Sequence, residues 1–195
     1  MVSLLRGDPL DMPYAAPRQW ILNQMPDQST GAEIGVHEGD FSARILEEVR
    51  PTQLHLIDPW EHFPELGDAK YGERASGEEE MDRRFEMVNR RFSEQIERGQ
   101  VQVHRSRSDD AVDLFEDHYF DWVYIDGNHL YEHVLQDLRS YIPKVKPGGM
   151  LMGDDYGVEG WWDDGVTRAV DEFTGRRGLN CETHGTQFIL SKPEG

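Results

Sequence analysis

FDWVYIDGNHLYEHVLQDL, residues 120–138, passes from a strand pattern to a helix pattern. Its first part is apolar and rich in aromatic and β-branched residues up to Asp126, and from about Tyr131 apolar residues recur near helical spacing. In an α/β fold, this is a strand followed by a helix that covers the sheet. Asp126 and His129 therefore lie where the carboxyl end of a strand presents side chains to a ligand.

The same stretch contains a second pattern. His129, Glu132 and His133 fit H-x-x-E-H, the inverted zinc-peptidase signature. That signature needs both histidines and the glutamate inside one helix, with a distant carboxylate as the third zinc ligand. Because His129 follows a strand and an Asp-Gly turn, Glu132 and His133 fall early on the covering helix instead. Short motifs of this kind arise by chance on charged helices, so a zinc peptidase is the weaker interpretation.

Strand and helix patterns alternate along the whole chain. Short apolar runs bounded by Gly, Pro or Asp are separated by segments with apolar residues near helical spacing. This alternation predicts an α/β fold with a doubly wound, mostly parallel sheet, in which ligands bind beyond the carboxyl ends of the strands. The expected strands are 31–36, 53–58, 101–105, 120–126, 149–155 and 187–191, and the expected helices are 42–50, 82–99, 131–145 and 166–178.

Length and composition restrict the class of protein. The 195 residues predict a single domain, 1–195, with a substantial core. The single cysteine, Cys181, rules out an intramolecular disulfide and a multi-cysteine zinc site and favours a reducing cytoplasm. No apolar run approaches the roughly 18 residues of a membrane span, and the N-terminal run is too short for a signal peptide. A formal net charge of −18 argues against a nucleic-acid partner, because phosphates would be repelled.

The first expected strand ends in a glycine-containing turn, Glu33-Ile-Gly35-Val-His-Glu-Gly39. Glycines there let the backbone approach a ligand closely. The spacing differs from the G-x-G-x-x-G of nicotinamide enzymes, and no phosphate loop follows. The second strand ends in Asp58, 19 residues after Gly39, where an acid is placed to accept hydrogen bonds from ribose hydroxyls. We therefore expect a nucleoside site, with Trp60 either covering the adenine or packed in the core.

With these motifs, the sequence resembles the class I S-adenosylmethionine-dependent methyltransferases. Residues 124–156, YIDGNHLYEHVLQDLRSYIPKVKPGGMLMGDDY, are similar to a segment of the macrocin-type sugar O-methyltransferases, whose wider group includes cephalosporin-hydroxylase-like proteins. The resemblance covers nearly the whole chain and implies a Rossmann-like fold with a seven-stranded sheet. It implies that Asp126, Asp154 and Asp155 bind Mg²⁺ or Mn²⁺, and that His129 is the general base. The group often has Glu-Asp where this chain has Asp-Asp.

The residues alone favour the same chemistry. Asp126 ends one strand and the pair Asp154 and Asp155 ends the next, so three carboxylates would meet at neighbouring strand tips, where a divalent cation relieves their repulsion. Carboxylate oxygens suit Mg²⁺ or Mn²⁺ better than zinc, and such a cation would hold a substrate diol and lower the pKa of its hydroxyl. His129 would then take the proton as the oxygen attacks the sulfonium methyl group.

The acceptor is predicted from the resemblance. The resemblance suggests a hydroxyl of a small molecule, namely a sugar, a polyol or a catechol-like diol. Trp161 or Trp162, in GWWDDG (160–165), either walls the acceptor pocket or packs in the core. One further alternative is a binding protein that holds S-adenosylmethionine or another nucleoside without transferring a methyl group. A homo-oligomer is compatible with the sequence.

Three other segments have predicted roles. Ser108 and Asp109 follow the third strand, where the family contacts adenine, although Asp109 also fits a helix cap. Residues 1–30, with a helix around APRQWILNQM, are expected to cap the cofactor site. Residues 61–92 are expected to form a lid or substrate insertion and a helix.

Overall fold

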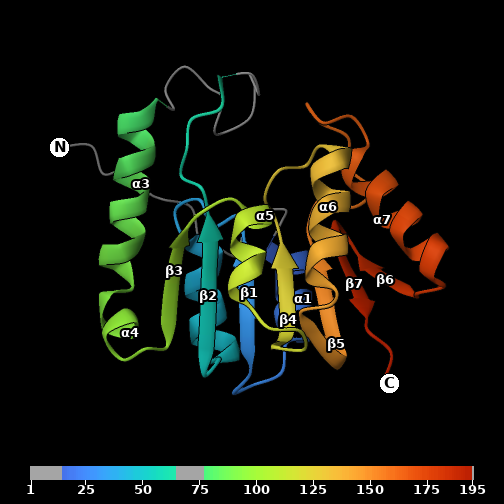
Figure 1. Cartoon of the computed structure of the whole chain (residues 1–195), viewed down its shortest axis with the longest axis horizontal. Coiled ribbons are helices and arrows are strands. Elements are labelled where there is room, and N and C mark those ends of the chain that lie inside the picture. The colour runs from blue at the N-terminus through green and yellow to red at the C-terminus, as the bar shows by residue number, and fades with distance from the viewer. Residues whose placement is uncertain (1–14, 65–76, 195) are drawn as a thin grey trace.

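The structure is a computed structural model that describes residues 15–64 and 77–194, and its centre is a seven-stranded sheet. The strands are β1 (Thr30–Ile34), β2 (Gln53–Asp58), β3 (Val101–Arg105), β4 (Phe120–Ile125), β5 (Val145–Gly153), β6 (Cys181–His184) and β7 (Gln187–Ser191). Their order is β3-β2-β1-β4-β5-β7-β6 (Figure 1). Neighbouring strands from β1 to β5 are parallel, and β7 is antiparallel to both β5 and β6. The predicted mostly parallel α/β sheet is confirmed.

Helices cover both faces of this sheet. They are α1 (Ala15–Leu22), α2 (Asp40–Arg44), η2 (Ile45–Val49), α3 (Glu78–Arg91), α4 (Ser93–Glu97), α5 (Ser108–Ala111), η4 (Val112–Leu114), α6 (Tyr131–Tyr141) and α7 (Gly165–Arg177). In Figure 1, α5, α6 and α7 lie in front of the sheet and α1 lies behind it. Each face has its own buried core, because successive side chains of a strand point to opposite faces: Val123 packs in the front core, and Trp122 and Tyr124 pack in the other. None of the described helices is long and apolar enough to cross a membrane.

Two differences from the predicted elements have physical reasons. Strand β6 was not predicted, because three of its four residues are exposed and it has no apolar pattern. The helix expected over 82–99 is divided into α3 and α4 at Phe92, whose φ of −108° and ψ of 20° are not helical. The Phe92 side chain is 3% exposed, so it is buried in the core at this break. Parts of the predicted cap (1–14) and lid (65–76) lie outside the described residues.

Helix α1 packs on the turn between β6 and β7. The Trp20 ring stacks on His184 with 5.2 Å between ring centroids. A Cβ atom at Gly185, whose φ is +58°, would lie 2.6 Å from Cγ of Pro17, so the turn approaches the helix too closely for a side chain. These contacts fix α1 beside the last strands, and its Arg18 reaches the carboxyl ends of β4 and β5.

A buried histidine in β2 makes the stability of the fold depend on pH. His55 is 2% exposed, and its Nδ1 lies 3.0 Å from His104 Nε2 while its Nε2 lies 3.2 Å from the Tyr119 hydroxyl. Burial, together with the nearby His104, lowers the pKa of His55 to about 4. In the unfolded chain a histidine binds its proton near pH 6.5, so the unfolded state is protonated first as the pH falls. We expect this contribution to stability to be complete above pH 6.5 and lost between pH 6.5 and 4.

Over this pH range the free energy of unfolding should decrease by about 3 kcal/mol, at roughly 1.4 kcal/mol per pH unit. Urea unfolding of the wild type and of His55→Gln at pH 7.5 and pH 4.5 measures it, because only the difference between their pH dependences belongs to His55. His118→Gln is the matched control, since His118 is exposed. Equal pH dependence in the wild type and His55→Gln would contradict the expectation.

Candidate active site

The site lies at the carboxyl ends of β1 and β4, where the chain order of the sheet reverses. Strands β2 and β3 lie on one side of this point and β5 on the other, which is where open α/β sheets bind ligands. The Asp126 amide donates to the Ile34 carbonyl (2.8 Å), and the Gly35 amide donates to the Ile57 carbonyl (2.9 Å). The first bond holds the loops after β1 and β4 side by side, and the second joins the β1 loop to the end of β2.

The two glycines of the turn, Gly35 and Gly39, lie too close to other parts of the protein to carry a side chain. Gly35 has a φ of +89°, and a Cβ atom there would lie 2.1 Å from the Asp126 carbonyl oxygen. Gly39 has a φ of +78°, begins α2, and would place a Cβ atom 2.8 Å from the Phe92 ring. Both conformations favour glycine. The structure thus gives these glycines a reason other than the predicted approach to a ligand; their contact with the cofactor stays a prediction.

The Asp58 carboxylate holds the glycine turn in place through hydrogen bonds to its backbone. Its carboxylate is 1% exposed; Oδ2 accepts hydrogen bonds from the amides of Val36 (2.9 Å) and His37 (3.0 Å), and Oδ1 accepts one from the Trp60 amide (2.8 Å). Ribose binding by Asp58 stays a prediction. Trp60 is fully buried, packs against Phe85 and donates from its indole N–H to the His37 carbonyl. The indole is thus packed in the core, and contact of Trp60 with an adenine stays a prediction.

Glu33 is a second buried acid of β1, at 2% exposure. It accepts a hydrogen bond from the Ser42 hydroxyl of α2 (2.5 Å). Burial raises the pKa of Glu33 to about 8, although the Ser42 hydrogen bond acts in the opposite direction. The side chain is therefore largely protonated at neutral pH, and a positive ligand nearby would favour its ionised form. Its contact with the cofactor stays a prediction.

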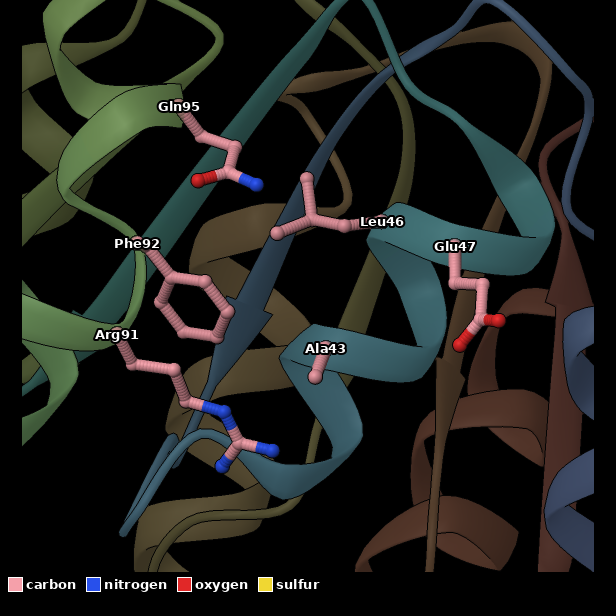
Figure 2. Close-up of a pocket in the computed structure, with 6 residues that line it drawn as sticks. All are labelled: Ala43, Leu46, Glu47, Arg91, Phe92 and Gln95. Atoms are coloured by element: carbon pink, nitrogen blue, oxygen red, sulfur yellow. The ribbon is translucent and has the colours of Figure 1, made fainter.

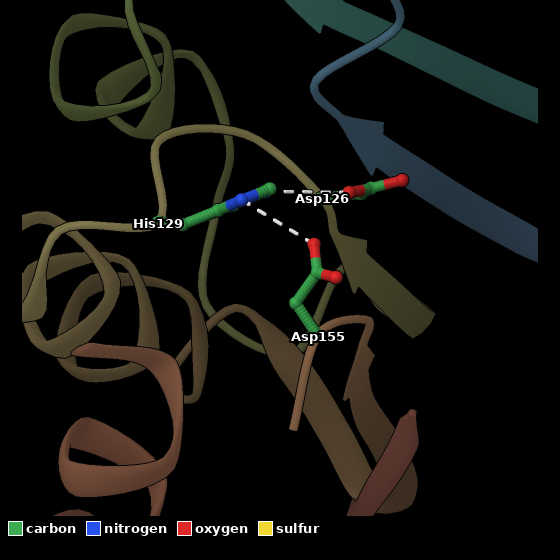
Figure 3. A group of neighbouring side chains, drawn as sticks. All are labelled: Asp126, His129 and Asp155. Atoms are coloured by element: carbon green, nitrogen blue, oxygen red, sulfur yellow. Dashed lines mark ion pairs between the residues drawn. The ribbon is translucent and has the colours of Figure 1, made fainter. Parts of the chain in front are cut away.

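Asp126, His129 and Asp155 form an acid–histidine–acid cluster (Figure 3). His129 Nε2 lies 3.4 Å from Asp126 Oδ1, and His129 Nδ1 lies 3.3 Å from Asp155 Oδ2. Asp155 reaches this position with a φ of +62°, in the left-handed region. One ligand atom from each residue lies within 4.8 Å of the others. Within the described ranges, no other group of three such side chains meets this criterion.

The groups of this cluster shift one another's pKa values. Burial lowers the pKa of His129, but the bond and charge of Asp126 and the charge of Asp155 outweigh burial, so the pKa lies above its usual value. Burial raises the pKa of Asp155 to about 6, against the opposing charge of His129. Both His129 ring nitrogens are buried and have no hydrogen-bond partner at normal distance. Each nitrogen instead faces a carboxylate, Nε2 that of Asp126 and Nδ1 that of Asp155.

Asp154 lies outside this cluster, contrary to the expectation that it would join Asp126 and Asp155. Its Oδ2 accepts hydrogen bonds from Arg18 Nε (3.1 Å) and Nη2 (3.0 Å). Its Oδ1 accepts from the Asp155 amide (2.8 Å) and from the Thr186 hydroxyl. Asp154 is 6% exposed, and its carboxylate links the end of β5 to α1 and to the turn between β6 and β7. A metal-binding role for Asp154 stays a prediction.

Sequence reasoning missed Arg18, which lies 108 residues from Asp126 along the chain. Its Nη2 lies 2.7 Å from Asp126 Oδ2. Burial lowers the pKa of Arg18, but Asp126 and other groups, Asp154 among them, raise it by more. The net pKa is therefore higher than usual, and the guanidinium stays charged. A lone arginine in a short helix carries no motif; the only available signal was the predicted closure of residues 1–30 over the site.

Ser108 and Asp109 begin α5. The Ser108 hydroxyl donates to the buried carboxylate of Asp137 (2.6 Å), and the Tyr141 hydroxyl donates to the Ser108 carbonyl (2.8 Å). Asp109 is exposed in the first turn and does not cap the helix, because the N-cap residue is Arg107. An acid in the first turn is still favourable at the positive end of a helix. Adenine contacts by Ser108 and Asp109 stay a prediction.

The H-x-x-E-H alternative fails on geometry. His129 lies before the helix, whose N-cap residue is Leu130. Glu132 and His133 are exposed in the first turn of α6, and the metal-compatible cluster that contains His129 includes neither of them. An inverted zinc-peptidase site needs all three on one helix, so the structure excludes it.

Two tryptophans flank His129. The Trp162 ring meets His129 edge to face, with 4.6 Å between centroids, and the Trp161 ring lies nearly parallel to His129 at 6.3 Å. Gly165 fixes this loop, because a Cβ atom there would lie 2.5 Å from the His129 carbonyl oxygen. Trp162 also packs against the front core. The two rings thus form an aromatic wall beside the cluster.

A separate groove of about 330 Å³ lies between η2 and the α3–α4 junction (Figure 2). It contains none of the predicted site residues. Its lining residues are Ala43, Leu46, Glu47, Arg91, Phe92 and Gln95.

Comparison with known proteins agrees with this geometry. A family model described as a methyltransferase domain matches residues 32–156. The uncharacterized protein y4gI of Sinorhizobium fredii is 24% identical over 144 residues, which cover 67% of this chain but only 14% of that protein. The chain therefore spans a small part of this relative's length.

Two solved structures share the fold. One is the O-methyltransferase TomG of Streptomyces achromogenes, which is involved in tomaymycin synthesis and was solved with S-adenosylmethionine. It is 18% identical, with a TM-score of 0.60, and the match covers 92% of this chain and 78% of that one. The other is the O-methyltransferase NovP: 23% identity, TM-score 0.61, covering 91% and 78%. The family-model match over residues 32–156 shows that the chain belongs to the methyltransferase domain family, as its resemblance to class I S-adenosylmethionine-dependent methyltransferases predicts.

Proposed function

We propose that this domain is an S-adenosylmethionine-dependent O-methyltransferase that methylates a hydroxyl of a small molecule with the help of a divalent cation. The observation that carries the proposal is the Asp126–His129–Asp155 cluster at the carboxyl ends of β4 and β5, next to the glycine turn of β1. TomG and NovP, which share the fold, are O-methyltransferases. This likeness supports the reaction type without identifying the acceptor.

The cofactor is expected to lie against the turn after β1. Asp58 fixes this turn through the amides of Val36 and His37, which gives the ligand a preorganised backbone. A positive ligand, such as the sulfonium and amino groups of S-adenosylmethionine, would favour the ionised form of the buried Glu33 beside this turn. The cofactor supplies an activated methyl group, so the protein's tasks are alignment and proton removal.

The cluster fits Mg²⁺ or Mn²⁺. It offers two carboxylates, Asp126 and Asp155, and the His129 imidazole lies beside them, where it can take a proton. Carboxylate oxygens suit both ions. When bound, such a cation would orient the acceptor oxygens and lower the pKa of the reacting hydroxyl.

His129 is the proposed general base. Asp126 Oδ1, 3.4 Å from its Nε2, and Asp155 Oδ2, 3.3 Å from its Nδ1, fix the orientation of the ring and stabilise its protonated form. Only the neutral imidazole can take the proton, so activity should increase with pH as His129 loses its own proton.

The surroundings of His129 suit a small ring-shaped acceptor. Trp161 and Trp162 form an aromatic wall beside it, and flat aromatic or sugar rings pack well on indole faces. The buried indole N–H of Trp162 has no hydrogen-bond partner and could donate to an acceptor oxygen. The net charge of −18 disfavours nucleic acid as the substrate.

Release of S-adenosylhomocysteine tests the function. The protein is incubated with S-adenosylmethionine and a panel of sugars, polyols and catechols, with Mg²⁺, Mn²⁺ or EDTA. Release that requires both an acceptor and a metal supports the proposal. Cofactor binding without release on any diol would favour the binding-protein alternative, and release that is equal in EDTA would remove the metal from the mechanism.

A further inference from the structure

Arg18 joins two of the acids at the site. Its Nη2 lies 2.7 Å from Asp126 Oδ2 and 3.0 Å from Asp154 Oδ2, and its Nε donates to the same Asp154 oxygen at 3.1 Å. The guanidinium also lies over the Phe41 ring, 5.1 Å from its centroid. The Arg18 side chain is 30% exposed, whereas that of Asp154 is 4% exposed. One positive charge from α1 thus bridges the tips of β4 and β5.

We propose that Arg18 competes with a divalent cation for these carboxylates and thereby sets how many of them the cation receives. The inference rests on the proposed metal dependence. Asp154 already accepts four hydrogen bonds, two of them from Arg18, so its Oδ2 reaches a cation only when Arg18 withdraws. With Arg18 in place, the cation has Asp126 and Asp155; with Arg18 displaced, Asp154 joins them. His129 keeps its role as the base in both states.

The charge balance gives the competition a direction. Asp126, Asp154 and Asp155 contribute up to three negative charges, and Arg18 cancels one of them. Loss of Arg18 should therefore tighten cation binding, because Coulomb attraction increases and two carboxylate oxygens are released. A purely structural Arg18 predicts the opposite result, because a loosened site would bind the cation more weakly.

Mn²⁺ titration of the full chain, followed by the electron paramagnetic resonance signal of free Mn²⁺, tests the competition without any substrate. We expect Arg18→Gln to lower the dissociation constant at least tenfold. Arg18→Lys keeps the charge but cannot make forked bonds to two carboxylates, so it should lower the constant about threefold. Thr186→Val is the matched control, because it removes a neutral donor from Asp154, and it should change the constant less than twofold.

The outcomes separate this inference from the proposed function. Equal or weaker Mn²⁺ binding by Arg18→Gln than by the wild type would overturn the competition and leave the metal site standing. Tightening by Thr186→Val as large as that by Arg18→Gln would also overturn it, since release of Asp154 rather than charge would then be the cause. Absence of Mn²⁺ binding in every folded variant would overturn both proposals. If the unfolding midpoint in EDTA shows that Arg18→Gln does not fold, Arg18→Lys takes its place. Equal or weaker Mn²⁺ binding by Arg18→Lys than by the wild type would then overturn the competition.

Discussion

Replacement of Gly35 by alanine is expected to destabilise the protein by more than about 4 kcal/mol, which is a large part of the 5–15 kcal/mol that stabilises a typical domain. Two causes add together. The φ of +89° is unfavourable for any residue with a Cβ atom, and this atom would lie 2.1 Å from the Asp126 carbonyl oxygen and 2.7 Å from Cα of Gly127. Because backbone rather than a flexible side chain lies in the way, β1 and β4 must separate. Cofactor binding should be lost together with stability.

Gly99 is the matched control for this prediction. Its φ is +74°, but a Cβ atom there would meet nothing within 4 Å. Gly99→Ala should therefore cost only the backbone term of about 1–2 kcal/mol. Urea unfolding of the two variants and the wild type, followed by circular dichroism, gives the comparison. Similar costs for Gly35→Ala and Gly99→Ala would show that the close approach of the two loops does not constrain the site.

Replacement of His129 by alanine is expected to lower kcat for methyl transfer by about 10²- to 10⁴-fold, the usual contribution of a general base. Initial rates of S-adenosylhomocysteine release are measured at saturating cofactor, acceptor and Mn²⁺, across pH 5–9. The wild type should gain activity with rising pH as His129 loses its proton, because only the neutral imidazole can act as the base. The remaining activity of the variant should no longer increase with pH in this way, while the variant should still bind the cofactor.

His133→Ala is the control for His129→Ala, because His133 is exposed one turn further on, in α6. It should keep its activity within about twofold, as most exposed substitutions do. Activity of His129→Ala within tenfold of the wild type, with an unchanged pH profile, would contradict the assignment of the base.

The sequence was most informative where strands are buried. Strands β1, β2, β4 and β7 have almost wholly buried patterns, and their runs of apolar residues marked them correctly. Strand β6 is mostly exposed and had no such signal. The break at Phe92 depends on a buried ring packed beside Gly39, a tertiary contact that overrides helical spacing.

The site was predictable at the level of strand ends but not of side-chain partners. Asp126, His129 and Asp155 come together because parallel strands present their carboxyl ends at one edge of the sheet. Which acid of the Asp154–Asp155 pair faces His129 depends on the left-handed backbone at Asp155 and on Arg18 from a distant helix. Neither feature leaves a local pattern.

Calorimetric titration of S-adenosylmethionine and S-adenosylhomocysteine into the folded protein tests the central claim most directly, because it needs neither an acceptor nor a metal. The wild type is expected to bind one equivalent. Asp58→Asn should weaken binding at least tenfold, because the buried carboxylate supports the glycine turn. Asp27→Asn, at an exposed ion pair with Arg50, should leave binding unchanged. Folded wild-type protein that binds neither compound would contradict the methyltransferase function.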